Sequence, residues 1–375
     1  MVVDLTIKLA VSALVLFVVL NFAGMQTWLE RKQSALMQDR IGANRAYFTF
    51  PWFWAAPINW LLRKLGGLGI LHSLADVLKL LTKEDFTPAT GHKVLHTAAP
   101  FLSVFFALLS FCAIPIGPTL QVFGREIPLQ VANVNAGLLF VLALGSIGIY
   151  GVILAGMASG SNLAALGGLR AASQLFAYEI ALGISLIGTI IVYGTLDLNL
   201  MVQQQGQHLL GGWLPAWGFF YQPVAFFIFM AAALAHTKRI PFDLPEAEPE
   251  IIGYFTEYSG MKFGMFFLTD FVEVVLVAAL ATTLFFGGWQ TPYLSPDGFA
   301  FPWGTTLPVS HLWFVVLGLV AFTIKVSAFI WLLMLIRWTL PRFRYDQLMH
   351  LGWKILFPLS VANVIVTGLA VVIRG

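Results

Sequence analysis

The stretch MKFGMFFLTDFVEVVLVAALATTLFFG, residues 261–287, decides the fold because it is long and apolar enough to cross a membrane as one helix. The hydrocarbon core of a bilayer is about 30 Å thick and a helix rises about 1.5 Å per residue, so a span needs roughly 20 residues. Two carboxylates, Asp270 and Glu273, nevertheless lie inside the stretch. It therefore predicts a transmembrane helix that carries ionisable groups at membrane depth.

Other stretches of the chain have the same character. The sequence is 59% hydrophobic and 10% charged, with a mean hydropathy of +0.84, which excludes an ordinary soluble domain. The first run is long enough to be a retained helix rather than a signal peptide. We predict an all-α integral membrane protein of about eight transmembrane helices, forming a single membrane domain over residues 1–375. The predicted spans lie near residues 5–29, 94–116, 137–158, 174–196, 216–235, 261–287, 312–336 and 352–373.

The basic residues lie almost entirely in alternate connections. Seventeen of the 21 Lys and Arg fall within 30–93, 159–173, 236–262 and 337–354, whereas the other connections contain only Arg125. Cytoplasmic loops are enriched in Lys and Arg. The sequence therefore predicts that these four connections are cytoplasmic and that both termini lie on the opposite face of the membrane.

The first of these connections, 30–93, contains an amphipathic stretch. FPWFWAAPINWLLRKLGGLGIL, residues 50–71, has three Trp and the basic pair Arg63 and Lys64, but only a short apolar run. Trp and basic side chains anchor helices at the membrane–water interface. We predict interfacial helices or a hairpin here, in contact with the lipid bilayer, rather than a further span.

Four ionisable residues fall inside predicted spans: Glu179, Asp270, Glu273 and Lys325. Each would cost roughly 2.5–3.5 kcal/mol facing lipid, so we expect them to face the bundle interior, a partner subunit or water. Carboxylates at membrane depth commonly mark proton or ion paths. The alternative is a buried charge pair, for example Lys325 with a carboxylate, or a residue that lies outside the true span.

The connection at 236–260 is rich in acids. PFDLPEAEPE, residues 241–250, is followed after seven positions by Glu257. Close carboxylates raise one another's pKa values, so some hold protons near neutral pH, as a proton relay requires. The alternative is an exposed acidic loop that is simply solvated or docks a basic partner. The carboxylates in this run are Asp243, Glu246, Glu248 and Glu250.

Several kinds of site are not indicated by the sequence. The lone Cys112 excludes a disulfide within the chain, a zinc site built on several cysteines and a self-contained iron–sulfur cluster. His92 and His96 have the spacing of metal ligands but no nearby HExxH-type carboxylate. The glycines at 66–69 lack the strand and the downstream acid of a dinucleotide site. We therefore predict no metal, nucleotide or nucleic-acid binding.

Six motifs, distributed over nearly the whole chain, carry a resemblance to a known family. The chain resembles the H subunit, subunit 1 in mitochondria, of respiratory complex I, the proton-pumping NADH:quinone oxidoreductase. Any one motif could arise by chance, but six in the family's order do not. The motifs are ERKQSALMQDRIGANR (30–45), ADVLKLLTKEDF (75–86), GGLRAASQLFAYE (167–179), RIPFDLPEAEPE (239–250), EYSGMKFGMFF (257–267) and PRFRYDQLMHLGWK (341–354).

The resemblance implies a role for the charged residues. It implies an eight-helix subunit that helps form the quinone tunnel, with quinone as substrate and no redox centre of its own. Residues that match charged positions of the tunnel are Arg31, Arg40, Arg239, Asp243, Arg337, Arg342 and Arg344. Residues that match the family's chain of acids, often called the E-channel, are Glu179, Glu246, Glu248, Glu250 and Glu257, with Asp270 nearby. The interval from Glu250 to Glu257 is one residue shorter than in the commonest form, which changes the register of this chain of acids.

The resemblance also implies partners and a location. FMN and iron–sulfur clusters are expected on other complex I subunits, and the partners are peripheral-arm subunits at the quinone site and antiporter-like membrane subunits. The location is the bacterial cytoplasmic (inner) membrane. One alternative is the homologous anchor of a complex-I-like hydrogenase or of an oxidoreductase with another electron donor. A stand-alone transporter would show an internal repeat and paired discontinuous helices, and neither is evident.

Overall fold

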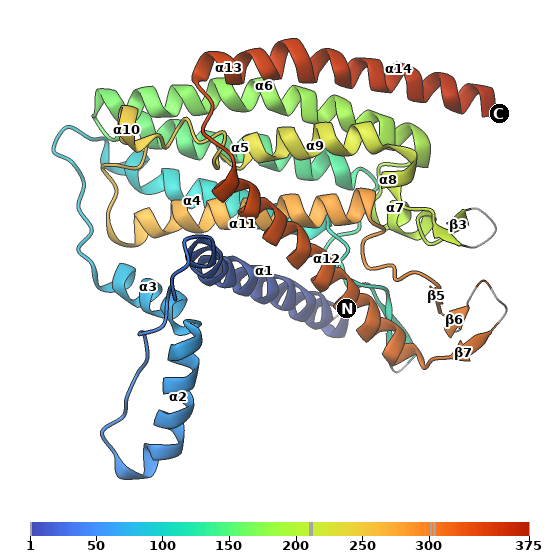
Figure 1. Ribbon diagram of the computed structural model, residues 1–375, viewed down its shortest axis with the longest axis horizontal. Coiled ribbons are helices and arrows are strands. Elements are labelled where there is room, and N and C mark those ends of the chain that lie inside the picture. Colours follow the sequence, from blue (N-terminus) through green and yellow to red (C-terminus); the bar gives the residue numbers. More distant parts are fainter. Residues whose placement is uncertain are drawn as a thin grey trace.

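The computed structural model describes residues 2–122, 124–209, 213–296, 298–300, 302 and 305–374, and most of them are helical (Figure 1). Seven helical stretches are long and apolar enough to cross a membrane. This confirms the predicted class, an all-α integral membrane protein. The main bundle helices are α1 (Val2–Met37), α4 (Lys93–Leu109), α5 (Gly137–Ala158), α6 (Asn162–Tyr193), α9 (Pro223–His236), α11 (Gly260–Phe285), α12 (His311–Thr339) and α14 (Phe357–Arg374).

Short elements connect the bundle helices. Within the described residues, three small antiparallel sheets lie in the connections, formed by β1 with β2, β3 with β4, and β5 with β6 and β7. The strands are β1 (Leu120–Val122), β2 (Arg125–Ile127), β3 (His208–Leu209), β4 (Leu214–Pro215), β5 (Leu294–Ser295), β6 (Gly298–Ala300) and β7 (Thr306–Pro308). The short helices are η1 (Phe53–Ala55), α2 (Ala56–Leu68), α3 (Leu71–Thr82), η2 (Ser110–Ala113), α7 (Leu198–Gln204), α8 (Gly218–Tyr221), α10 (Glu248–Ile251), α13 (Tyr345–His350) and the π-helical turn η4 (Leu351–Leu356).

Helix α11, which carries both Asp270 and Glu273, lies at the centre of the bundle. In its most apolar window 72% of the residues are buried, more than in any other candidate span of the described chain. It packs against α1, α4 and α12. A helix that is apolar all round is typical of such a central position. This position encloses the two carboxylates in protein rather than lipid.

Two helices are longer than predicted. Helix α6 begins at Asn162, so most of the predicted connection at 159–173 is helical, and α1 continues to Met37, so Glu30 and Arg31 lie on a helix. Neither segment contains a proline, and Gly167 and Gly168 are buried within α6, where they pack closely against neighbouring backbone instead of forming a turn. The turn between α5 and α6 is made at Gly160, whose φ of +68° suits glycine.

The span predicted at 216–235 is interrupted. Its main helix, α9, has 14 residues, which is about 21 Å and less than the thickness of the hydrocarbon core. Pro223 starts α9 and cannot continue the preceding α8 because it has no backbone N–H to donate. Non-helical backbone at membrane depth is stable only where protein or water satisfies it. The backbone groups of the chain after His236 therefore need hydrogen-bond partners inside the bundle.

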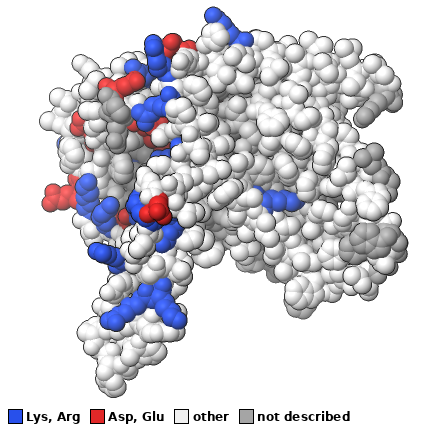
Figure 2. Space-filling view, viewed as in Figure 1, with Lys and Arg blue, Asp and Glu red and all other residues white. Residues whose placement is uncertain are grey.

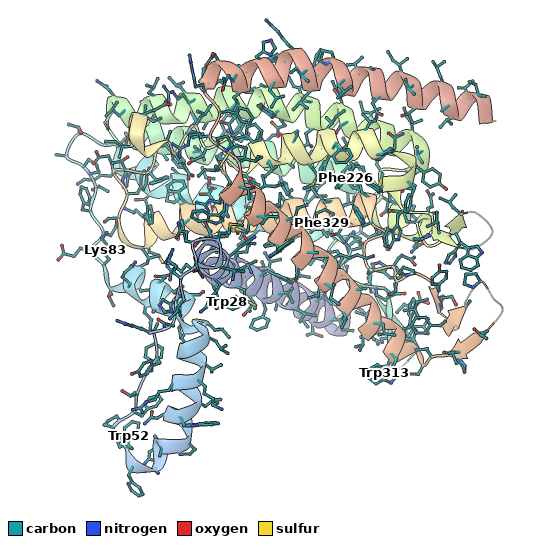
Figure 3. The ribbon with its side chains drawn as sticks, in the orientation of Figure 1. Trp28, Trp52, Lys83, Phe226, Trp313 and Phe329 are labelled. Carbon is teal, nitrogen blue, oxygen red and sulfur yellow. The ribbon has the colours of Figure 1, made fainter. Side chains whose placement is uncertain are left out.

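Helix α2 projects from the bundle at one end, whereas α3 packs against α1 and α11 (Figure 1). The two helices meet at a bend of 93°. At the start of α2, the side chain of Asn59 bonds both the N–H and the C=O of Phe50, at 2.8 and 2.9 Å. Trp52 lies near the far tip (Figure 3). The interfacial location of this segment stays a prediction.

The charged residues gather at the end of the molecule from which α2 projects. Figure 2 shows Lys, Arg, Asp and Glu there, whereas the opposite end of the visible face is almost free of them. This is the one-sided distribution expected from the loop charges. That this end is cytoplasmic stays a prediction.

Candidate functional site

A cavity of about 410 Å³ opens at the charged end, where the loop after α9 meets α11 and the end of α12. Charged side chains and phenylalanine rings share its wall, so it combines polar and apolar surfaces. Its lining residues are Lys238, Arg239, Ile240, Asp243, Glu246, Phe255, Phe263, Phe266, Phe267, Asp270, Arg337 and Arg342.

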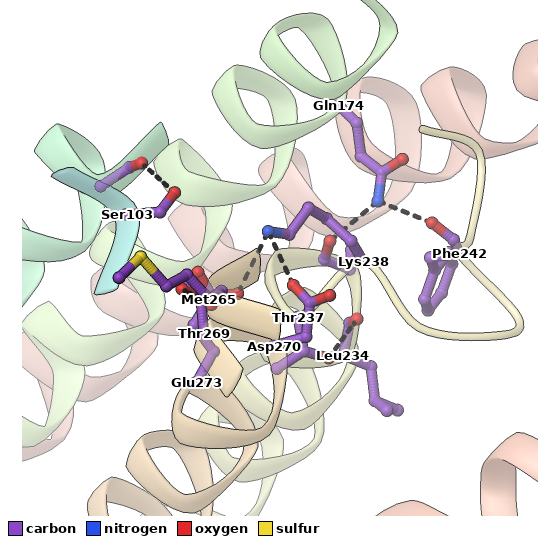
Figure 4. A network of polar contacts seen from close by, with 12 residues as sticks. Ser103, Gln174, Leu234, Thr237, Lys238, Phe242, Met265, Thr269, Asp270 and Glu273 are labelled. Carbon is purple, nitrogen blue, oxygen red and sulfur yellow. Dashed lines mark hydrogen bonds and ion pairs between the residues drawn. The ribbon is translucent and has the colours of Figure 1, made fainter. Parts of the chain in front are cut away.

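The loop that follows α9 is held by the side chain of Gln174 on α6. The Gln174 amide donates to the carbonyls of Ala235 and Phe242, both at 2.8 Å, and so ties the two ends of the loop to one point (Figure 4). Within the loop, Lys238 has a φ of +52°, a conformation uncommon outside glycine. The hydrogen bonds from Gln174 thus satisfy backbone carbonyls at the end of α9 and in the loop that follows it.

Lys238 is the central charge of the site. Only 2% of its side chain is exposed, and its ammonium lies 3.1 Å from Asp270 Oδ1 and 3.5 Å from Glu273 Oε2 (Figure 4). The two carboxylates are three residues apart on α11 and so share one face of the helix. Burial alone lowers the pKa of Lys238, but attraction to Glu273, Asp270 and Glu246 outweighs it and raises that pKa. Lys238 therefore stays charged within the protein.

Glu246 faces the same group from the loop. Burial, together with the neighbouring Asp270 and Asp243, raises the pKa of Glu246 well above that of an ordinary carboxyl group, although Lys238 opposes the shift. Glu246 and Asp270 both line the cavity. Because its pKa is raised, Glu246 keeps its proton to a higher pH than an ordinary carboxyl group does.

A second ion cluster lies beside the cavity and joins three distant parts of the chain. Glu30 on α1 accepts from Arg337 on α12 and lies 3.7 Å from Arg239 of the loop. The guanidinium of Arg239 also lies over the ring of Phe271, 4.4 Å from its centre. A single carboxylate thus holds two arginines that line the cavity.

Asp243 pairs with Arg342 at 2.8 Å, and 13% of its side chain is exposed. Burial raises the pKa of Asp243 to about 6, against the opposing pull of Arg342 and Arg337. Asp243 therefore changes charge close to neutral pH.

This shift predicts a pH dependence of stability. A carboxyl whose folded pKa lies above its unfolded value of 3.8 stabilises the fold at low pH, and that contribution is lost as the pH rises through about 6. Asp243→Asn removes this pH-dependent contribution. Between pH 4.5 and 7 the variant should therefore gain stability relative to the unsubstituted chain, by up to about 3 kcal/mol, and its thermal midpoint should rise relative to that of the unsubstituted chain. Asp346→Asn, at an exposed carboxylate on α13, should give a flat difference. A stability difference for Asp243→Asn that does not change with pH would contradict the raised pKa of Asp243.

Glu179 lies deeper, apart from the large cavity. A small cavity of about 30 Å³ separates it from His236, the last residue of α9. Ser146 on α5 donates a hydrogen bond to Glu179 Oε1. The remaining lining residues are apolar apart from the backbone at Gly145: Val141, Leu142, Leu182, Phe229, Leu276, Val277 and Leu280.

The structure brings some of the predicted site residues together and separates others. Of the predicted tunnel residues, Arg239, Asp243, Arg337 and Arg342 line the large cavity, as do Glu246 and Asp270 of the predicted acids. Three predicted tunnel arginines have other partners: Arg31 pairs with Asp76 at 2.6 Å, Arg40 donates to Gln38 at 2.7 Å, and Arg344 pairs with Asp346 at 3.2 Å.

The remaining predicted acids lie away from the large cavity. Glu250 pairs with Arg170 at 2.7 Å, with half of its side chain exposed. The backbone carbonyl of Glu257 lies 3.2 Å from His96 Nε2. The side chain of Glu248 lies outside the described residues. The acids of the loop thus divide into a buried group and a peripheral group.

Sequence reasoning missed three residues of the site: Lys238, Glu30 and His236. Lys238 counted only toward the charge of its connection, and Glu30 appeared only as the first residue of a motif. They belong to or adjoin the run His236-Thr237-Lys238-Arg239 and the end of α1. Polar residues directly after a span normally reach the aqueous interface, so no local signal marked them as buried.

The structure corrects one further expectation, the charge pair of Lys325. Lys325 pairs with no carboxylate among the described residues, which corrects the charge-pair example. Its ammonium donates to the carbonyls of Phe286, Gly288 and Gln290 at 2.6–3.0 Å, because the C-terminus of α11 leaves those groups unpaired. His96 stacks on Tyr258 with ring centres 3.9 Å apart. No group of three or more potential metal ligands occurs in the described chain.

The fold and the site define a multi-pass membrane protein with a buried ionic network at one end of its bundle. A family model described as NADH dehydrogenase matches residues 9–368. One H subunit of the NADH-quinone oxidoreductase of Geobacter metallireducens is 44% identical over 99% of this chain and 98% of its own length. The H subunit of the NADH-quinone oxidoreductase of Thermomicrobium roseum is 43% identical over 96% of each chain.

The chain belongs to the family formed by the H subunits of NADH-quinone oxidoreductase, which is the complex I subunit 1 family. This confirms the resemblance seen in the six motifs. The chain is thus a multi-pass bacterial membrane protein and one component of a multi-subunit oxidoreductase.

Proposed function

We propose that this subunit forms part of the quinone-binding tunnel and couples quinone reduction to proton translocation through its buried acids. The observation that carries the proposal is the large cavity, whose wall joins Arg239 and Arg342 to the acids Asp243, Glu246 and Asp270. The relatives are named for NADH and quinone, which supports this function over the anchor of a hydrogenase. In this proposal the quinone headgroup is reduced in the large cavity, next to these acidic side chains.

The lining of the cavity suits a quinone. Its two carbonyl oxygens accept hydrogen bonds, which arginine side chains supply, and its apolar ring and tail suit the phenylalanine side chains. Reduction to quinol takes two electrons and two protons. The electrons come from FMN and iron–sulfur clusters on peripheral partner subunits, since the chain's lone Cys112 cannot hold a cluster.

Proton coupling follows from the charge balance of the site. Reduced quinone draws protons, and Glu246, whose raised pKa favours its protonated form, lines the large cavity. Loss of the Glu246 proton changes the charge facing Lys238, which contacts Asp270 and Glu273 together. The change is passed toward Glu179 and then to neighbouring antiporter-like subunits. The outer part of this path comprises Glu248, Glu250 and Glu257.

The orientation follows the positive-inside rule. The charged end faces the cytoplasm, and both termini lie on the other side of the bacterial cytoplasmic membrane. The α2–α3 segment lies along the cytoplasmic surface of the bilayer, with Trp52, Trp54 and Trp60 at the interface. Cysteine labelling of intact cells at Arg125 and at Lys83 tests this, since only the former should react with an impermeant reagent.

Two substitutions test the coupling. Glu179→Gln and Glu246→Gln keep the size of each side chain but remove its ability to carry a proton, so we expect the protons pumped per electron to fall at least tenfold. Proton uptake and quinone reduction are measured together on the assembled complex in proteoliposomes. Asp346→Asn, at an exposed carboxylate on the same end, should pump normally. Full pumping by both Gln variants would overturn the proposed function.

A further inference from the structure

The proposed proton path has a gap between α11 and α6. Glu273 on α11 contacts Lys238, and Glu179 on α6 contacts Ser146. No hydrogen bond joins Glu273 to Glu179 among the described residues. A proton that moves from one acid to the other therefore needs an intermediate group.

His236 lines the small cavity together with Glu179 of α6 and with Leu276 and Val277 of α11. Those two residues follow Glu273 by three and four positions, so they lie next to it on the same face of the helix. The cavity that His236 shares with Glu179 is thus bordered by the turn of α11 that follows Glu273.

The turn at the end of α9 connects the two groups of acids. Lys238 contacts Glu273, and His236, two residues earlier, faces Glu179 across the small cavity. Figure 4 shows Thr237 and Lys238 of this turn beside Asp270 and Glu273. Gln174 fixes the turn by bonding the carbonyl of Ala235. The position of the imidazole is therefore set by the same contacts that position the ammonium.

Gly145 leaves room for the ring. A Cβ atom at this position would lie 3.6 Å from both Cε1 and Nε2 of His236. The next residue, Ser146, donates to Glu179. The small cavity, about 30 Å³, is large enough for one water molecule, which needs roughly 10–15 Å³ by the same kind of measure. One water can thus bridge the imidazole and the carboxyl group.

We infer that His236 is the proton relay between Glu273 and Glu179, an inference that rests on the proposed function. Its imidazole takes a proton on one ring nitrogen and releases the proton of the other nitrogen toward Glu179, directly or through one water. The ring returns to its neutral form, so no net charge or co-reactant is left over. Histidine suits this task because its two nitrogens can bind and release protons at opposite edges.

The test compares His236→Gln with Glu179→Gln on the assembled complex in proteoliposomes. For His236→Gln we expect the protons pumped per electron to fall at least tenfold, and His236→Glu, which restores a group that titrates, should recover at least half of the wild-type ratio. A merely structural role would give no such recovery. Normal pumping by His236→Gln with failed pumping by Glu179→Gln would overturn the inference alone. Normal pumping by both would overturn the proposed function.

A second pair of variants acts on the cavity without touching the titratable groups. Gly145→Leu fills the space for the bridging water and should lower the pumping ratio, whereas Gly145→Ala adds one methyl at ordinary contact distance and should not. If His236→Gln lowers the amount of assembled complex, the two Gly145 variants still test whether His236 is the relay. Equal pumping by the Leu and Ala variants would overturn the inference.

Discussion

Lys238→Met should sharply lower the stability of the subunit and its retention in the complex. The ammonium of Lys238 is 2% exposed and holds Asp270 and Glu273, whose side chains are 12% and 14% exposed. Removing one partner of a buried ion pair leaves uncompensated charge and costs about 3–5 kcal/mol. The measurements are the thermal midpoint of the purified complex and the amount of this chain that it retains.

A second substitution separates charge from packing. In Lys238→Met combined with Glu273→Gln, one unpaired carboxylate is gone, so a substantial part of the loss should be recovered. Lys79→Met is the matched control because Lys79 is 70% exposed and lies 3.8 Å from Asp76, a pair worth at most about 1 kcal/mol. Equal losses for Lys238→Met and Lys79→Met would show that the buried ammonium is dispensable.

Glu30→Gln should raise the KM for quinone at least tenfold. Glu30 is the shared partner of Arg239 and Arg337, and both arginines line the large cavity. Without the carboxylate the two guanidinium groups repel each other, so neither keeps the position from which it can donate to a quinone. A tenfold change corresponds to about 1.4 kcal/mol of binding free energy. The measurement is the rate of quinone reduction by the assembled complex as the quinone concentration is varied.

Two further variants control the Glu30 experiment. Glu30→Asp keeps the charge on a shorter side chain and should have a smaller effect than Glu30→Gln. Asp76→Asn removes the partner of Arg31, which does not belong to the lining of the large cavity, and should leave the KM within about twofold. An unchanged KM for Glu30→Gln would mean that the shared carboxylate does not position the two arginines.

The helices could be predicted from the sequence because their signal is local. A run of more than about 20 apolar residues predicts a transmembrane helix because a helix of that length matches the thickness of the hydrocarbon core. The interruption at Pro223 was missed because an apolar run continues on both sides of it. The length and hydropathy of a run do not reveal that Pro223 lacks a backbone N–H, although this missing donor decides where α9 begins.

The candidate site was predictable only in part. Asp243, Glu246 and Asp270 stood out because charge in or beside an apolar span is costly and therefore conspicuous. The second ion cluster was not predictable, since Glu30, Arg239 and Arg337 are far apart in the sequence and meet only in the folded bundle. Lys238 was hidden for a different reason. A lysine in a connection normally reaches solvent, and only the turn with φ of +52° directs this one inward.

The shortness of α9 has an electrical consequence. Where a helix covers only about 21 Å, ionic groups and water replace part of the hydrocarbon that insulates the two sides of the membrane. The transmembrane voltage then falls mainly across the remaining apolar layer, on the far side of His236 and Glu179. A proton that crosses a voltage of 100 mV does about 2.3 kcal/mol of work. On the proposed proton path, we expect most of that work to fall in the steps beyond Glu179 and little of it in proton exchange within the ionic network.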